Sequence, residues 1–363
     1  MQRRGFLSTA GAGMAGILAT GAAPAFAQGA EIKWRMASSF PKSLDTIHGA
    51  AEHLAARVAA ATGGRFQIQV FASGEIVPGL QVFDAAQNGT VQAAFTAPYY
   101  FWGKDPAFAL DTAVPFGLNA RQIVAWQLFG GGLQLFREFY RGYGIHGMPS
   151  GNTGAQMGGW FRKEIKGVAD MKGLKMRIGG FAGKVMERLG VISQLTAASD
   201  IYPALEKGAL DAVEFVGPYD DEKLGFHKVA RYYYYPGWWE GGAQLSTMVN
   251  LKEFEKLPKE YQAILETACW EANSWMLAKY DAQNPPALRR LVAGGAQLRA
   301  FPRDVMVAGY KASLEVYREA SEKSPAFRRI YDSMTKFRGE ELLWFRVAEK
   351  GFDDFMHGIG SIK

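Results

Sequence analysis

Strand-like and helix-like segments alternate from residue 31 onward, and this order restricts the fold more than any other feature of the sequence. Residues 31–36 and 66–71 alternate polar and apolar side chains, as half-buried strands do. Between them, residues 43–62 carry apolar side chains at helical spacing, and Gly63 and Gly64 end that segment. A β-α-β opening of this kind predicts an α/β protein with helices on the faces of a sheet.

The alternation begins again near residue 151, which predicts two lobes, and a chain of 363 residues is long enough for both. We expect lobe I to comprise residues 28–150 with about 244–300, and lobe II to comprise residues 151–243. A long helix over 258–284 should bridge the lobes and end before Pro285 and Pro286, because prolines break helices. Further helices are expected over 303–363.

Residues 1–27 have the features of an export signal. Arg3 and Arg4 are followed by a weakly apolar run rich in Gly and Ala, and then by the cleavage-like sequence Ala25-Phe26-Ala27. The paired arginines favour the twin-arginine route, and the alternative is an ordinary secretory signal. Either reading predicts a mature periplasmic protein that starts near Gln28.

Charge and motif content exclude several classes of function. The chain has 41 Lys and Arg against 35 Asp and Glu, a net charge of +6, which becomes 6 − 2 = +4 without Arg3 and Arg4. This dilute excess suits small anions rather than nucleic acid. A single cysteine, Cys269, excludes intrachain disulfides and cysteine-based metal sites. Because HExxH and GxSxG motifs are absent, a secreted enzyme is a weaker alternative, and the lack of repeats disfavours a structural protein.

Arg177 is the first candidate for ligand binding. The alternation in residues 172–180 places Arg177 opposite Met176, at the end of a predicted strand and beside Gly179 and Gly180. An arginine in that position can hold a carboxylate with two parallel hydrogen bonds. The alternative is a surface arginine in a salt bridge.

Glu214 and Gln156 are the next candidates. Glu214 is a carboxylate within the apolar run 212–216, and burying it without a partner is costly. It should therefore face a cation, an arginine or a cleft, and a structural salt bridge with Arg177 would satisfy the same need. Gln156 follows the polar segment 152–155, and its amide oxygen together with a carboxylate suits Na⁺ or Ca²⁺.

These residues carry a resemblance to a known family. Residues 174–177, 201–208 and 210–214 resemble the periplasmic solute receptors of tripartite ATP-independent (TRAP) transporters, and the likeness extends over nearly the whole mature chain. Residues 214–221, with 232–239, resemble the branch that binds 2-oxo and 2-hydroxy monocarboxylates such as pyruvate or lactate. This resemblance implies a two-lobed α/β binding-protein fold with a ligand cleft between the lobes, and a receptor rather than an enzyme.

The resemblance also implies roles for particular residues. Arg177 matches the arginine that grips the carboxylate, while Gln156, Glu214 and the backbone carbonyl of Phe215 match the positions that hold a cation, Na⁺ or Ca²⁺. Further cleft candidates are Tyr100, Asn152, Trp160, Trp238 and Glu240. A receptor for a dicarboxylate or an aromatic acid without metal is the alternative.

The same resemblance implies partners. The receptor would deliver a small organic acid to the membrane permease subunits of the transporter. The helices after residue 303 resemble a dimerisation element, which predicts a homodimer. Two apolar stripes motivate this expectation: Val307, Tyr310, Leu314 and Tyr317, and then Phe327, Ile330, Met334 and Phe337.

Overall fold

The computed structural model describes residues 31–359, so the predicted signal segment lies outside the described residues. Lobe I is built on a five-stranded sheet in the order β2-β1-β3-β10-β4. Its strands are β1 (Ile32–Ser38), β2 (Phe66–Phe71), β3 (Ala93–Thr96), β4 (Ile145–Asn152) and β10 (Gln244–Asn250). β1 is parallel to β2 and β3, whereas β10 is antiparallel to β3 and β4. The expected β-α-β opening is therefore present.

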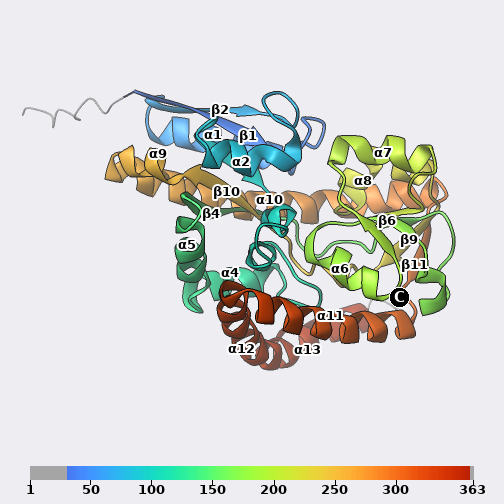
Figure 1. The fold of residues 1–363 in the computed structure, drawn as a ribbon. Coiled ribbons are helices and arrows are strands. Elements are labelled where there is room, and N and C mark those ends of the chain that lie inside the picture. Colours follow the sequence, from blue (N-terminus) through green and yellow to red (C-terminus); the bar gives the residue numbers. More distant parts are fainter. Residues whose placement is uncertain (1–30, 360–363) are drawn as a thin grey trace, which may run out of the picture.

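Lobe II is built on a six-stranded sheet in the order β11-β9-β5-β8-β6-β7. Its strands are β5 (Trp160–Phe161), β6 (Lys175–Arg177), β7 (Ile192–Gln194), β8 (Ala212–Val213), β9 (Tyr232–Tyr235) and β11 (Gln297–Ala300). β11 pairs with β9, so this segment joins the second sheet, although the sequence grouped it with lobe I. Figure 1 shows the two lobes side by side.

Helices cover both sheets. Those of lobe I are α1 (Gly49–Ala61), η1 (Gly79–Gln81), α2 (Val82–Gln87), η2 (Pro98–Phe101), α3 (Ala107–Leu110), α4 (Ala120–Phe129), α5 (Gly132–Arg141) and α9 (Leu251–Lys256). Those of lobe II are η3 (Val168–Met171), α6 (Gly180–Arg188), α7 (Ala198–Glu206), α8 (Pro218–Leu224) and η4 (Phe226–Lys228). α4 begins with a capping box between Asn119 and Gln122, which satisfies its first free backbone donors.

The bridging helix α10 (Lys259–Ala293) is longer than expected, because it continues through Pro285 and Pro286. An internal proline removes a helical hydrogen bond and costs about 3 kcal/mol. Here the last turns are held by tertiary contacts, since Ala287 and Leu291 are buried and Arg290 forms an ion pair with Glu222 of α8. Packing therefore overrides the local helix-breaking preference, and α10 passes along both lobes (Figure 1).

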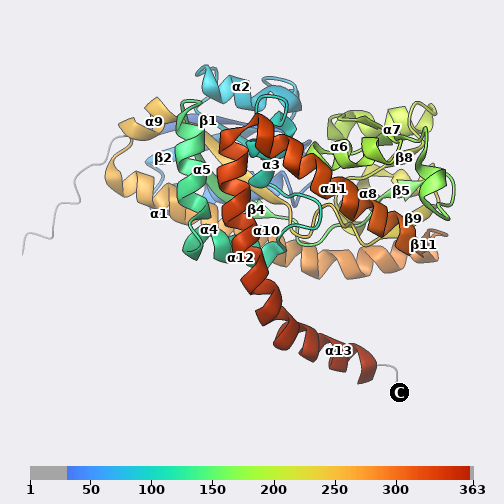
Figure 2. The ribbon, with the colours of Figure 1, turned by 60° about the horizontal axis from the view of Figure 1, so that its bottom comes forward.

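Three helices close the chain: α11 (Arg303–Lys323), α12 (Pro325–Val347) and α13 (Glu349–Ile359). α11 crosses from lobe II back to lobe I, and α13 extends away from the body of the molecule (Figure 2). The second predicted stripe does not face outward, because Phe327, Ile330 and Met334 are buried within the chain itself. The first stripe is divided, with Tyr317 buried and Val307 exposed.

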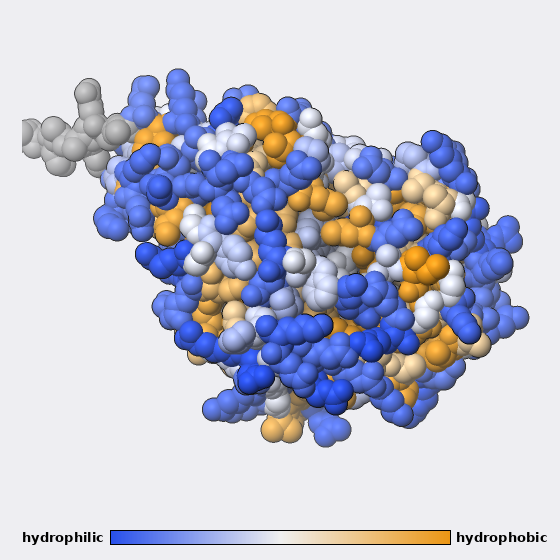
Figure 3. All heavy atoms as spheres, in the orientation of Figure 1, coloured by the Kyte–Doolittle hydropathy of each residue, from blue (hydrophilic) through white to orange (hydrophobic). Residues whose placement is uncertain are grey.

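Val307, Tyr310 and Leu314 of the first predicted stripe are exposed. A second group of exposed apolar residues, which was not expected, lies further along the chain. We refer to them as the C-terminal apolar surface: Leu342, Leu343, Trp344, Val347, Phe352, Phe355, Met356 and Ile359. By contrast, the face drawn in Figure 3 is mainly hydrophilic, with scattered apolar residues. Over residues 31–359, the structure contains no helix that is long and apolar enough to cross a membrane.

Candidate functional site

A small cavity, with room for about one water molecule, lies where the two lobes meet. Lobe I contributes the loops that follow β1 and β3, and lobe II contributes the segment that follows β8. The lining residues are Phe40, Ile47, Ala97, Tyr99, Tyr100, Thr153, Gln156, Phe215, Val216, Ala243 and Leu245. Because most of the lining is apolar, polar groups at this cavity act in a poorly hydrated environment.

The backbone fixes the segments that carry the candidate residues. Glu214 donates its N–H to the carbonyl oxygen of Arg177 at 2.9 Å, which extends the pairing of β6 with β8. Gln156 donates its N–H to the carbonyl oxygen of Glu240 at 3.1 Å, and Met157 donates to Val216 at 3.0 Å. The chain therefore brings the predicted Arg177, Glu214, Gln156 and Glu240 together on one rigid framework.

Arg177 is 1% exposed and lies at the end of β6. Its Nη1 is 3.3 Å from Oε2 of Glu214 and also donates to the backbone carbonyl oxygen of Glu214, while its Nε donates to the carbonyl oxygen of Thr196 at 3.3 Å. The guanidinium carbon lies 5.3 Å from the centre of the Phe215 ring. These contacts hold the guanidinium in place, as recognition of a planar carboxylate requires.

Two buried carboxylates lie near this single arginine. Burial raises the pKa of Glu214 to about 8, although the charge of Arg177 and the N–H of Gly179 act in the opposite direction. Burial also raises the pKa of Glu240 well above its ordinary value, and the charge of Glu214 raises it further. Two like charges at one dry site destabilise each other's ionised form unless a cation is added.

Several oxygen atoms at the site lack a hydrogen-bond donor among the described residues. They are Oε1 of Gln156, Oε1 of Glu214 and, by strict hydrogen-bond geometry, both carboxylate oxygens of Glu240, although the Tyr99 hydroxyl lies near enough to lower the pKa of Glu240. The amide nitrogen of Gln156 is occupied, because it donates to Oγ1 of Thr153 at 3.1 Å, and this leaves the amide oxygen free to bind. Carboxylate and amide oxygens are the ligands preferred by Na⁺- and Ca²⁺-type hard cations, so these residues fit such an ion.

The described residues contain no cluster of three or more His, Cys, Asp or Glu side chains that could hold a metal ion by themselves. A cation held here would instead need neutral oxygens, such as the Gln156 amide and a backbone carbonyl. It would also need oxygens from a bound ligand.

Three predicted cleft residues, Asn152, Trp160 and Trp238, contact other parts of the protein and not the cavity. Asn152 accepts a hydrogen bond from the N–H of Gly154 at 2.9 Å, so its side chain shapes the turn after β4. Trp160 donates to Asp221 at 3.0 Å and stacks on Tyr233 beneath the site. Trp238 stacks on Phe116, whose ring centre is 5.0 Å away. These three side chains do not line the cavity, and neither do the predicted Arg177, Glu214 and Glu240. The predicted Gln156, Tyr100 and Phe215 do line it.

The sequence interpretation missed Tyr99, Phe40, Ile47 and Thr153, which line the same cavity. Tyr99 and Phe40 each lie just beyond the carboxyl end of a parallel strand, β3 and β1, where α/β sheets place their ligands. That positional rule was the available signal, and it would have favoured Tyr99 together with Tyr100.

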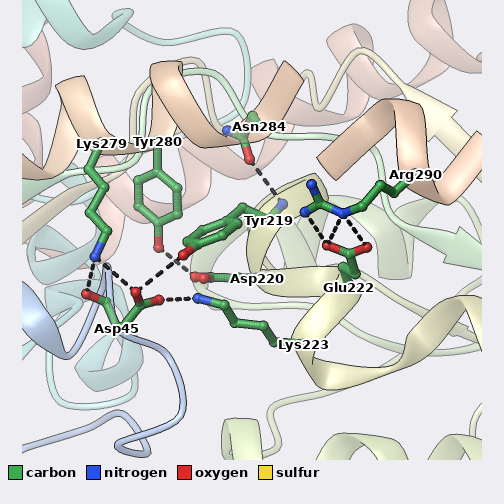
Figure 4. Close-up of polar contacts among 9 residues, drawn as sticks. All are labelled: Asp45, Tyr219, Asp220, Glu222, Lys223, Lys279, Tyr280, Asn284 and Arg290. Carbon is green, nitrogen blue, oxygen red and sulfur yellow. Dashed lines mark hydrogen bonds and ion pairs between the residues drawn. The ribbon is translucent and has the colours of Figure 1, made fainter. Parts of the chain in front are cut away.

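A polar network joins the lobes beside the cavity (Figure 4). Asp45 lies in the same lobe I loop as Phe40 and Ile47, and it forms ion pairs with Lys223 of α8 and with Lys279 of α10. Tyr219 of α8 also donates its hydroxyl to Asp45 at 3.2 Å. Asp45 therefore connects lobe I to lobe II and to the bridging helix.

α8 itself is anchored by buried carboxylates. Asp220 accepts a hydrogen bond from the hydroxyl of Tyr280 of α10 at 2.5 Å, and Asp221 accepts one from Tyr233 at 2.7 Å. Burial raises the pKa of Asp220 to about 6 and that of Asp221 to about 7. Because α8 starts four residues after Glu214, these anchors also fix the segment that lines the cavity.

Two α/β lobes, a bridging helix and a buried arginine at an interlobe cavity define a solute-binding receptor. The chain belongs to family 7 of the bacterial extracellular solute-binding proteins, the DctP family of TRAP receptors, whose profile matches residues 37–324. This assignment confirms the expected class, a transport receptor outside the cytoplasm rather than an enzyme. It also confirms the two-lobed fold.

Three relatives illustrate the similarity. A monocarboxylate 2-oxoacid-binding periplasmic protein from Nostoc sp. is 52% identical over 324 residues, which cover 89% of each chain. A TRAP solute-binding protein from Bordetella bronchiseptica is 53% identical, with a TM-score of 0.90 over 92% of this chain and 99% of that chain. That structure is described as a mixed-occupancy dimer with co-purified calcium and picolinate in one site. A receptor from Pseudoalteromonas atlantica, with sodium and pyruvate, is 37% identical, with a TM-score of 0.87 over 89% of this chain and 99% of that chain.

Proposed function

We propose that this receptor binds a small 2-oxo or 2-hydroxy monocarboxylate, such as pyruvate, together with Na⁺ or Ca²⁺. Arg177 holds the carboxylate. Gln156, Glu214 and the backbone carbonyl of Phe215 hold the cation, and Glu240 and Tyr100 complete the polar surroundings. The chain carries out no bond-making step, because its task is to enclose the acid and release it to the permease.

The observation that carries this proposal is the set of buried oxygens without donors beside one arginine. Glu214, Glu240 and Gln156 together leave four such oxygens, and a polar atom buried without a partner costs about 1–3 kcal/mol. A cation satisfies several of these oxygens at once, whereas an arginine in a plain salt bridge does not.

Charge balance supports the same ligand pair. Without a cation, the raised pKa values of Glu214 and Glu240 favour their protonated forms. When both carboxylates ionise, they and Arg177 carry one net negative charge, which would repel an anionic solute. A bound Ca²⁺ and a monocarboxylate bring this group to neutrality, and Na⁺ compensates in part. A 2-oxo acid suits the arrangement, because its carboxylate and neighbouring carbonyl can share the ion. A dianionic ligand would again leave excess negative charge.

The relatives support this class of solute. The Nostoc protein is named for 2-oxoacids, and the Pseudoalteromonas receptor is described with sodium and pyruvate. The Bordetella receptor favours a second candidate, since its picolinate is an aromatic acid with a ring nitrogen next to the carboxylate. Such an acid offers a cation the same pair of neighbouring donors as a 2-oxo acid does.

The family of the chain supports a proposed place for it in transport. Export would depend on the signal in residues 1–27, of the twin-arginine type, and the mature receptor would present its closed lobes to the TRAP membrane subunits. In this receptor, residues 151–243 would form the core of lobe II.

We further propose that the mature chain forms a homodimer through the C-terminal apolar surface. Contiguous exposed apolar patches mark interaction sites in soluble proteins, and α13 stands away from its own lobes (Figure 2). The Bordetella relative is described as a dimer.

Native mass spectrometry of receptor purified without dialysis, combined with elemental analysis, tests the proposal. We expect one small monocarboxylic acid and one Na⁺ or Ca²⁺ per subunit, with the Arg177→Ala variant carrying no acid. Recovery of a dicarboxylate without metal would contradict the proposal and favour the metal-free alternative.

A further inference from the structure

Tyr99 of lobe I packs closely against Gly179 and Gly180 of lobe II. Tyr99 belongs to η2, which follows β3, and Gly179 lies between β6 and α6, two residues after Arg177. α6 and η2 also meet through Phe181 and Trp102, whose ring centres are 5.9 Å apart. The contact with the two glycines therefore belongs to an extended interface between the lobes at the edge of the candidate site.

Gly179 is a glycine for reasons of space and not of backbone conformation. Its φ of −81° and ψ of 153° are those of ordinary extended chain, which any residue adopts. A Cβ atom built at Gly179, however, would lie 2.9 Å from both Cζ and the hydroxyl oxygen of Tyr99. Real Cβ atoms do not approach other heavy atoms that closely, so either Tyr99 or a lobe would have to move.

Tyr99 has little freedom to give way. The residue is 5% exposed, and its ring packs against Tyr100 with the ring centres 5.0 Å apart. Its backbone N–H donates to Oγ1 of Thr112 at 3.0 Å, which fixes the start of the side chain. The Tyr99 ring also packs against Gly180, because a Cβ atom built at Gly180 would collide with it.

We propose that Gly179 is a positioning residue for ligand binding, because the absence of a side chain at this position leaves the space that the Tyr99 ring occupies when the lobes close. The inference rests on the proposed function, and it adds a determinant of affinity that makes no contact with the ligand. A methyl group at position 179 would displace the Tyr99 ring from this space. The cavity would then not close fully, and the acid would bind more weakly.

Calorimetric titration of pyruvate in the presence of Ca²⁺ tests this role of Gly179. We expect Gly179→Ala to bind pyruvate about tenfold or more weakly, as overpacking of a filled contact implies. The matched control is Gly103→Ala, four residues from Tyr99, where a Cβ has no neighbour within 4 Å and affinity should stay unchanged. Small-angle scattering should show wild-type compaction on binding and a larger radius of gyration for Gly179→Ala at saturation.

A double-mutant cycle separates this role from a general structural defect. In a Tyr99→Ala background, Gly179→Ala should weaken binding less than about twofold further, because the colliding ring is gone. An equal loss in both backgrounds, or wild-type affinity in Gly179→Ala, overturns the inference. Should Gly179→Ala fail to fold, Tyr99→Trp enlarges the same contact from lobe I, and wild-type affinity there overturns the inference as well. If the wild-type chain binds no pyruvate with either cation, the proposed function fails instead.

Discussion

Arg177 and Glu214 form a buried ion pair that involves one guanidinium nitrogen and one carboxylate oxygen. Nη1 of Arg177 lies 3.3 Å from Oε2 of Glu214, whereas Oε1 of Glu214 has no donor among the described residues. The two side chains are 1% and 0% exposed. A buried pair repays its desolvation only when its remaining lone pairs are satisfied. The incomplete pairing therefore favours a site that receives further ligands over a purely structural salt bridge.

Arg177→Lys should weaken pyruvate binding by on the order of 2–5 kcal/mol, because an ammonium group cannot reproduce the two-pronged contact with a carboxylate. Calorimetric titration measures this change, and circular dichroism checks the fold. Lys175→Gln is the matched control, since Lys175 lies on the same strand but is exposed. Wild-type affinity in Arg177→Lys would remove Arg177 from the ligand site.

The stability of receptor stripped of cations should fall as the pH rises from about 5 to about 8. The pKa of Glu214 is raised to about 8, so the folded chain holds a proton there that the unfolded chain, with an ordinary value near 4.5, has released. Folding then binds protons, and stability decreases with pH across this window. Asp111, Asp220 and Asp221 contribute with the same sign, because burial raises their pKa values too.

Added Ca²⁺ should therefore raise the unfolding temperature more at pH 8 than at pH 6, since the cation competes with protons for the same carboxylates. Glu214→Gln should reduce this difference. Scanning fluorimetry with and without Ca²⁺ provides the comparison. A calcium effect that is equal at both pH values, or larger at pH 6, would speak against Glu214 as a ligand.

Asp45→Asn should weaken acid binding by about two- to fivefold, because exposed ion pairs contribute about 0.2–1 kcal/mol each and these contacts join the lobes. Glu222→Gln is the matched control. Glu222 lies on the same helix α8 as Lys223, but its ion pair is with Arg290 of α10 and not with Asp45 (Figure 4). If both variants lose the same affinity, the network is not specific to lobe closure.

Light scattering of the mature chain should give twice the subunit mass at micromolar concentration. Leu343→Glu combined with Phe352→Glu should give monomers, because charges in an apolar interface are costly to bury. Ile192→Glu, at an exposed apolar position of lobe II, is the control. A monomeric wild type would contradict the proposed dimer.

The alternation of strands and helices was sufficient to predict both lobes, because side-chain periodicity reports which face is buried. It was insufficient at Pro285 and Pro286, where burial of Ala287 and Leu291 sustains α10 against the local preference. It also misjudged the stripe with Phe327 and Ile330, because an apolar helix face looks the same whether it packs on its own chain or on another.

Six of the nine predicted site residues converge, and for the charged and amide side chains among them the reason was visible in the sequence. A charged or amide side chain in an apolar setting needs a partner, as Arg177 and Glu214 show. Trp160 and Trp238 carried no such signal, since an aromatic side chain serves a core as well as a cleft. Tyr99 was missed although its position after β3 was an available signal, and its contact with Gly179, a residue distant in the sequence, could not be read from the sequence.

The dependence of acid binding on a cation tests the central claim most directly. The receptor is stripped with chelator, dialysed into a sodium-free potassium buffer, and titrated with pyruvate in the calorimeter, then titrated again after addition of Ca²⁺ or Na⁺. Binding linkage is reciprocal, so Glu214→Gln should weaken the binding of cation and acid together. We predict no measurable binding without either ion and full restoration with one of them. Full affinity for pyruvate with neither ion present would contradict the account and leave Arg177 and Glu214 as a salt bridge.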